Sequence, residues 1–162
     1  MEGVLKMYSK ILVPLDGSET AETVIKFVEE LSTPPAEVVL LRVAAPVEHD
    51  VLAETGRLIP VWEQRVSLET HFSHYLRRTG ASLRHRGIKV TTEVRFGKPV
   101  KEILESAATH GVDLVAMASH GRKGLDRLIH GSVSSAVLKE SSVPVLVLNA
   151  TKSAEVGKVV AA

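Results

Sequence analysis

The fold is decided by the stretch DLVAMASHGRKGLDRLIHGSVSSAVLKESSVPVLVL, residues 113–148. Apolar runs over 113–118 and 143–148 predict two buried strands, each bounded by turn residues. Between them lie a glycine-containing loop over 119–131 and a short amphipathic helix over 132–140. A strand, a crossover helix and a second strand join parallel strands with a right-handed connection. This stretch therefore predicts one unit of a parallel α/β sheet.

The chain before this stretch repeats the alternation of strand and helix. Apolar runs predict strands over 10–15, 37–43 and 88–96, and helical spacing predicts helices over 20–31, 61–86 and 99–110. Residues 44–60 are expected to form an irregular loop. Five strands are too few for a barrel, so we predict an α/β fold with an open five-stranded parallel sheet and helices on both faces. A single domain is expected over residues 1–162, with its core at about 8–149 and a tail at 150–162.

The edges of the sheet can be predicted from two strand patterns. In the run from Ile88 to Phe96, apolar and charged residues alternate, which predicts one solvated face and a position at the edge. The last strand, Val143–Leu148, is apolar throughout but contains Pro144, a residue that is confined to edge strands and strand starts. We therefore expect an edge strand that another surface covers.

Composition excludes several classes of protein. The 162 residues include 20 Lys and Arg against 19 Asp and Glu, and a net charge of +1 argues against a dedicated nucleic-acid or membrane-surface protein. The chain has no cysteine, which excludes disulfides and thiol nucleophiles and favours the cytoplasm. No apolar run reaches the roughly 18 residues that a membrane span requires.

Two of the predicted strands end in turn-rich segments, at 14–18 (PLDGS) and at 119–124 (SHGRKG). Ligands of open parallel sheets bind at the carboxyl ends of the strands, where the strand order reverses. Glycines allow backbone N–H groups to approach an anion, and Gly131-Ser132 opens a helix whose N-terminus favours negative charge. Cations and hydroxyls that could contact phosphate follow nearby: Arg122, Lys123, Arg127, Ser132 and Ser134. The pattern predicts an anion-binding loop.

The spacing of this loop, Ala118-x2-Gly121-x9-Gly131-Ser132, resembles the G-x2-G-x9-G-[ST] nucleotide loop of the universal stress protein family. The segments KILVPLDGSETAE (10–22), EVVLLRV (37–43) and 96–149 are similar to the same family in their order. The resemblance implies a Rossmann-like fold, similar to that of the adenine nucleotide α-hydrolases, with strand order 3-2-1-4-5. It also implies a homodimer in which Val143–Leu148 pairs with its copy.

In its ATP-binding branch, the resemblance implies ATP, with Mg²⁺ as the ion that accompanies it. We expect no metal site or catalytic residue in the chain itself, because the sequence offers no water-activating base and no evident metal carboxylate besides Asp16. Asp16 would lie by the adenosine, Val43 would line the adenine pocket, and Gly121, Gly131 and Ser132 would hold the phosphates. The complete set of expected contact residues is Pro14, Asp16, Val43, Met117, Ala118, Gly121, Arg122, Gly131, Ser132, Val133 and Ser134. Ala118 departs from the motif, since a glycine is expected there.

Three functions remain open at this stage. The first is a regulatory module of the stress response that binds ATP and can act with a protein partner of unknown identity. At most slow ATP hydrolysis is expected of it, because no water-activating base is evident. The second is a dimeric interaction protein without nucleotide, which Ala118 favours. The third is an adenylating ligase or sulfurtransferase, whose first loop would carry SGGxDS where this chain has Asp16-Gly17-Ser18. Asp16 could also serve only to cap the first helix.

Overall fold

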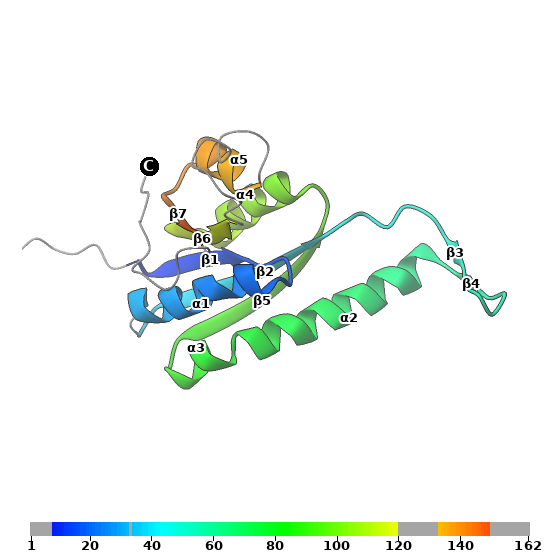
Figure 1. Ribbon diagram of the computed structural model, residues 1–162, viewed down its shortest axis with the longest axis horizontal. Helices are drawn as coiled ribbons and strands as arrows, with labels where there is room; N and C mark the ends of the chain where they lie inside the picture. Colours follow the sequence, from blue (N-terminus) through cyan, green and yellow to red (C-terminus); the bar gives the residue numbers. More distant parts are fainter. Residues whose placement is uncertain (1–7, 33, 120–132, 150–162) are drawn as a thin grey trace, which may run out of the picture.

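The computed structural model describes residues 8–32, 34–119 and 133–149. Five strands form one parallel sheet: β1 (Lys10–Pro14), β2 (Glu37–Ala44), β5 (Lys89–Phe96), β6 (Leu114–Ser119) and β7 (Val145–Asn149). Their order is β5-β2-β1-β6-β7 (Figure 1). Counted without the two short strands of a separate hairpin, this is the order 3-2-1-4-5, so the predicted fold is confirmed.

Helices cover both faces of the sheet (Figure 1). One layer holds α1 (Glu19–Leu31), α2 (Val61–Thr79) and α3 (Ala81–His85), and the other holds α4 (Pro99–His110) and α5 (Val133–Glu140). Side chains alternate between the faces of a strand, so Ile11 and Val13 pack toward α1 while Leu12 packs toward α4. Because both faces are covered, the central strands are mainly apolar. Among the described residues, no helix is both long and apolar enough to span a bilayer.

The edge strand β5 pairs with β2 alone among the described strands, as the sequence predicts. Its polar face, however, is not open to solvent: Thr91, Glu93 and Arg95 are half-buried. The reason is that α4 presents a polar stripe to this face, at Glu102 and, one and two turns later, at Ser106 and His110. The expectation of a solvated face was therefore wrong, although the edge position is correct.

The expected helix over 61–86 is two helices, separated at Gly80. Leu76 and Leu83 lie on either side of the break, and both are fully buried. A Cβ atom on Gly80 would lie 2.9 Å from Leu40 Cδ1 and 3.0 Å from Val90 Cγ1, so the backbone approaches the sheet closely at this point. Gly87, at φ 78°, ends α3 with hydrogen bonds from Gly87 N to Arg84 O and from Ile88 N to Leu83 O.

The segment 44–60 is not irregular throughout, as had been expected. It contains a two-stranded antiparallel hairpin, β3 (Val51–Leu52) and β4 (Leu58–Ile59). The hairpin and the first turns of α2 project away from the sheet (Figure 1). We call this projection, residues 48–66, the arm.

The last strand begins one residue after Pro144 rather than including it. The Pro144 carbonyl accepts a hydrogen bond of 3.0 Å from Val115 N, and the ladder with β6 then runs from Val115↔Val145 to Ser119↔Asn149. Proline at the start of a strand removes no ladder donor. An apolar edge strand preceded by proline is thus consistent with its position.

Candidate functional site

The candidate site lies where the ladder between β1 and β6 stops. These strands pair only at Ile11↔Leu114 and Leu12↔Val115, although β1 continues to Pro14 and β6 continues to Ser119. On its other side, β1 stays paired with β2 as far as Pro14↔Leu41. The strand order reverses between β1 and β6, which is the place where open α/β sheets bind ligands.

Asp16 lies in a tight turn directly after β1. Its Oδ1 accepts hydrogen bonds from Ser18 N at 2.9 Å and from Ser18 Oγ at 2.6 Å. Gly17 between them has φ 87°, a conformation that glycine adopts without strain. The Ser18 hydroxyl in turn accepts from Ala21 N at 3.1 Å and caps α1. Asp16 therefore does not cap the helix itself: it orients the serine that does.

Arg42 supports this turn from the neighbouring strand. Its Nη1 donates to Leu15 O at 3.3 Å, and its guanidinium lies 4.8 Å from the centre of the Phe72 ring. Sequence analysis treated β2 as a buried apolar strand and assigned Arg42 no role. A signal for this role was present in the sequence, because Arg42 is a single cation within an apolar run. A charged side chain in a buried strand needs polar or aromatic partners.

The wall of the site is formed by the ends of β2 and β6. Leu41 of β2 pairs with Pro14 of β1. Val43 and Asp16 each follow this pair by two residues, so they lie at the same level at the ends of the two strands. Met117 is buried on the face covered by α4 and α5, and half-buried Val43 packs against the same cluster. Ala118 pairs with Leu148 and points to the opposite face of the sheet from Met117.

The first turn of α5 completes the described part of the site. Val133 is exposed. Ser134 is buried and has an interaction partner. The expected phosphate contacts Gly121, Arg122, Gly131 and Ser132, and the cations Lys123 and Arg127, lie outside the described residues. The structure thus gathers Pro14, Asp16, Val43, Met117 and Ala118 at the carboxyl-terminal ends of the inner strands. The phosphate-binding half of the site stays a prediction.

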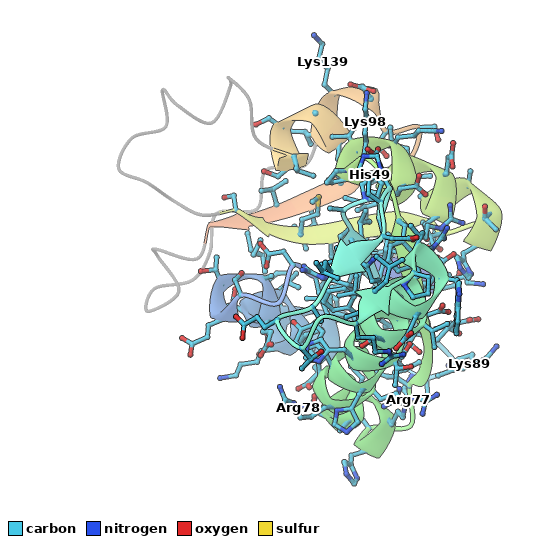
Figure 2. All side chains as sticks on the ribbon, turned by 90° about the vertical axis from the view of Figure 1, so that its right-hand side faces the viewer. His49, Arg77, Arg78, Lys89, Lys98 and Lys139 are labelled. Carbon is cyan, nitrogen blue, oxygen red and sulfur yellow. The ribbon has the colours of Figure 1, made fainter. Side chains whose placement is uncertain are left out.

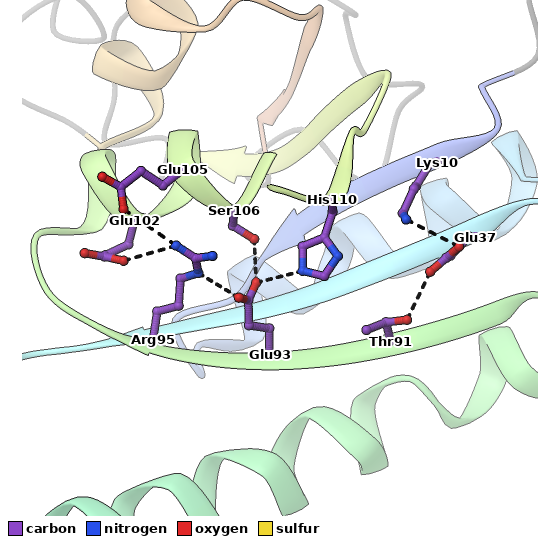
Figure 3. A network of polar contacts seen from close by, with 9 residues as sticks. All are labelled: Lys10, Glu37, Thr91, Glu93, Arg95, Glu102, Glu105, Ser106 and His110. Carbon is purple, nitrogen blue, oxygen red and sulfur yellow. Dashed lines mark hydrogen bonds and ion pairs between the residues drawn. The ribbon is translucent and has the colours of Figure 1, made fainter. Parts of the chain in front are cut away.

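A second polar group, which sequence analysis missed, lies between β5 and α4 (Figure 3). Glu93 Oε2 accepts from Ser106 Oγ at 2.6 Å and contacts His110 Nε2 at 3.1 Å, while Glu93 Oε1 accepts from Arg95 Nε at 2.7 Å. Arg95 also contacts Glu102 at 3.5 Å. The polar stripe at spacing i, i+4, i+8 on the helix was the available signal.

The charge of this group is fixed by its contacts. Burial alone would raise the pKa of the Glu93 carboxyl, but hydrogen bonds from Ser106 and Arg95 and the charge of Arg95 outweigh burial and hold the pKa below its usual 4.5. Glu93 is therefore ionised at neutral pH. Ser106 and His110 both contact the carboxylate rather than each other, so the group lacks the nucleophile-to-base contact that a hydrolytic triad requires. We interpret it as a structural link between β5 and α4.

The described residues of the site combine one carboxylate with apolar side chains. Among them, no group of three or more His, Asp or Glu side chains is arranged to hold a metal ion. The site offers an acidic turn, apolar side chains from two strand ends and the start of a helix. A ligand that matches these features combines a polar part, which can contact the acidic turn, with an apolar part.

These features define a doubly wound parallel α/β protein with a ligand site at its switch point. A match to the model of the universal stress protein family extends over residues 7–149, and the chain belongs to this family. It is 34% identical over 159 residues to universal stress protein MJ0577 of Methanocaldococcus jannaschii, covering 91% of this chain and 98% of that protein. The solved structure of MJ0577 superposes with a TM-score of 0.69, covering 88% of this chain and 96% of the other.

Two more distant structures have the same fold. One is a universal stress protein in complex with cAMP, with a TM-score of 0.66 at 17% identity, covering 89% of this chain and 98% of that one. The other is a family protein from Arabidopsis thaliana with AMP bound, with a TM-score of 0.62 at 17% identity, covering 87% and 91%. At this identity the two likenesses establish the fold alone.

Proposed function

We propose that this chain is a nucleotide-binding regulatory module of the stress response in the cytoplasm, and that it binds ATP, with Mg²⁺ as the accompanying ion. The observation that carries the proposal is the early end of the β1–β6 ladder beside the Asp16 turn. The adenosine would lie by Asp16 and Val43, and the phosphates by Gly121, Gly131 and Ser132. Membership of a family with nucleotide-bound members supports the choice of ligand class.

Binding is measured by calorimetry with ATP, ADP and adenosine, with and without magnesium. Gly131→Val adds side-chain atoms where the backbone would approach phosphate, and we expect it to abolish ATP binding. Ser132→Ala removes one hydrogen bond to a charged group, which weakens ATP binding by roughly tenfold or more but leaves adenosine binding unchanged. Lys89→Ala, an exposed position at the amino-terminal end of β5 and so at the opposite end of the sheet, is the control and binds like the wild type.

The alternative is an interaction module without nucleotide, which Ala118 favours because its methyl group replaces a motif glycine. Ala118→Gly separates the two functions. If the methyl group obstructs a nucleotide, this variant gains affinity over the wild type. A wild-type protein that takes up no ATP at about millimolar concentration, near the weak limit of specific binding, establishes the alternative.

We also propose that the β7 edge pairs with its copy in a homodimer. Because Val115 N donates to Pro144 O, the alternation of the ladder directs the N–H groups of Val145 and Val147 to the outer edge. Val145 itself is only 3% exposed, so a charge at that position would disrupt the core rather than the edge. Val147→Pro instead removes one outward donor. It is expected to weaken dimerisation in sedimentation experiments, with circular dichroism as the check on folding.

A further inference from the structure

Among the described residues, the arm carries most of the large apolar side chains that are exposed. Seven large apolar residues are at least 36% exposed in the described part of the chain, and five of them lie on the arm. These five are Val51, Leu52, Leu58, Trp62 and Val66. A two-stranded hairpin alone is marginally stable in water, and exposed apolar residues gathered on one projection typically mark an interaction surface.

The arm is held in one conformation by contacts between the hairpin and α2. Asp50 Oδ1 accepts from Val61 N at 2.8 Å, which satisfies a free donor in the first turn of the helix. Gln64 Nε2 donates to Ile59 O at 3.0 Å, and Arg57 Nη2 contacts both carboxylate oxygens of Glu63 at 2.8 Å. The exposed surface is therefore preorganised, and little ordering is required when it binds.

The outer face of α2 combines a projecting side chain with a hollow. Trp62 is 67% exposed, and Val66 follows one turn later on the same face. Along the same face, the small side chains of Thr70 and Ser73 leave a shallow hollow of about 450 Å³, which is open to solvent and is formed by α2 alone. Its lining residues are Val66, Glu69, Thr70, Ser73, His74 and Arg77. A large side chain next to a hollow on one face becomes self-complementary when a second copy is turned by a twofold axis.

Charges at the two ends of this surface, on the arm and near the end of α2, favour the same arrangement. Neither Arg77 nor Arg78, near the end of α2, has an ion-pair partner among the described residues, and Figure 2 shows both side chains at the side of the molecule away from α4 and α5. The hairpin end of the arm carries Glu48, Asp50 and Glu54. Antiparallel packing brings the arginines of one copy to the acidic hairpin of the other. It also places the two helix dipoles in opposite directions.

We propose that the outer face of α2, together with the hairpin, is an interface between two copies of this chain. The helices pack antiparallel about a twofold axis near Val66, and each Trp62 occupies the hollow of the other copy. The occupant is thus a second copy rather than an unrelated protein. This interface is separate from the β7 edge and does not depend on nucleotide binding.

Trp62 is the single tryptophan of the chain, so its fluorescence reports on this surface directly. The full-length protein is diluted from about 100 to about 0.1 micromolar, a range that spans typical weak-dimer affinities. We expect the emission to shift to longer wavelength and iodide quenching to increase on dilution. Val147→Pro, which weakens the β7 edge, should retain this shift. Emission typical of an exposed indole at every concentration overturns the proposal and leaves the surface to another partner.

A second experiment uses the absence of cysteine from the natural sequence. Val66→Cys places one thiol near the twofold axis at a position that is 57% exposed, so the fold should tolerate it. We expect mild oxidation to convert this variant to a disulfide-linked dimer. Lys101→Cys, on the exposed face of α4, is the matched control and should crosslink at least tenfold more slowly. Equal crosslinking rates of the two variants contradict a specific interface at α2.

Discussion

At the scale of single residues, Asp16 has a structural contribution that can be separated from ligand binding. Its Oδ1 accepts two hydrogen bonds from Ser18, so Asp16→Ala should destabilise the protein by about 1 kcal/mol. Asp16→Asn retains an acceptor and should have nearly wild-type stability in urea unfolding. If the carboxylate charge contacts the nucleoside, Asp16→Asn still weakens adenosine binding in calorimetry. Equal adenosine affinity of Asp16→Asn and the wild type would show that only the turn matters.

Glu93 makes the stability of the protein sensitive to acid. Because contacts with Ser106 and Arg95 lower the pKa of Glu93 in the folded state, its stabilising contribution is present above the unfolded pKa. That contribution decreases as the pH falls from about 5 through the folded pKa, since the carboxylate must then be protonated.

The matching variant is Glu93→Gln, which removes the charge but keeps a similar shape. We expect a lower unfolding free energy at pH 7 and a smaller further loss between pH 7 and pH 3 than in the wild type. Urea unfolding at several pH values measures both quantities. Glu30→Gln, at an exposed position of α1, is the control and should follow the wild-type profile. A Glu93→Gln profile parallel to the wild type would contradict this role of the carboxylate.

At the scale of elements, the break between α2 and α3 depends on the missing side chain of Gly80. Gly80→Ala forces its new Cβ against Leu40 and Val90, which should cost about 1–3 kcal/mol of stability. In a Val90→Ala background one of these contacts is absent, so the same substitution should cost less. Equilibrium unfolding of the four proteins of this cycle gives the coupling directly. Additive effects would show that the close approach to Val90 is relieved elsewhere.

The elements that periodicity predicts correctly are those in which packing and local pattern agree. The five sheet strands and α1 bury regular apolar faces, and the pattern in sequence is therefore clear. The break at Gly80 was missed because Leu76 and Leu83 are seven residues apart and continue one helical stripe through it. The hairpin was missed because strands of two residues are too short to establish an alternation. The buried polar face of β5 could be identified only by pairing it with the stripe on α4.

At the scale of the whole molecule, the position of the candidate site follows from topology. The strand order reverses between the adjacent strands β1 and β6. This places the Asp16 turn and the end of β6 side by side at the carboxyl-terminal end of the sheet, although about 100 residues separate them in sequence. Sequence patterns predicted both turns, and the family resemblance supplied the order that brings them together. Side-chain packing of Arg42 on Phe72 could not be predicted, because it depends on how α2 lies across the sheet.

The same topology allows the two proposed interfaces to operate together. The β7 edge lies across the whole sheet from β5, a separation of about 19 Å for four strand spacings, whereas α2 packs on β5 and β2. We therefore expect the wild-type protein to form species larger than a dimer at high concentration in sedimentation velocity experiments.

Val66→Glu places like charges at the α2 axis and should leave the β7 dimer. Val147→Pro should leave the α2 dimer, and the double variant should be a monomer. If Val66→Glu alone gives a monomer, there is no independent β7 dimer, and the two surfaces must contribute to a single interface.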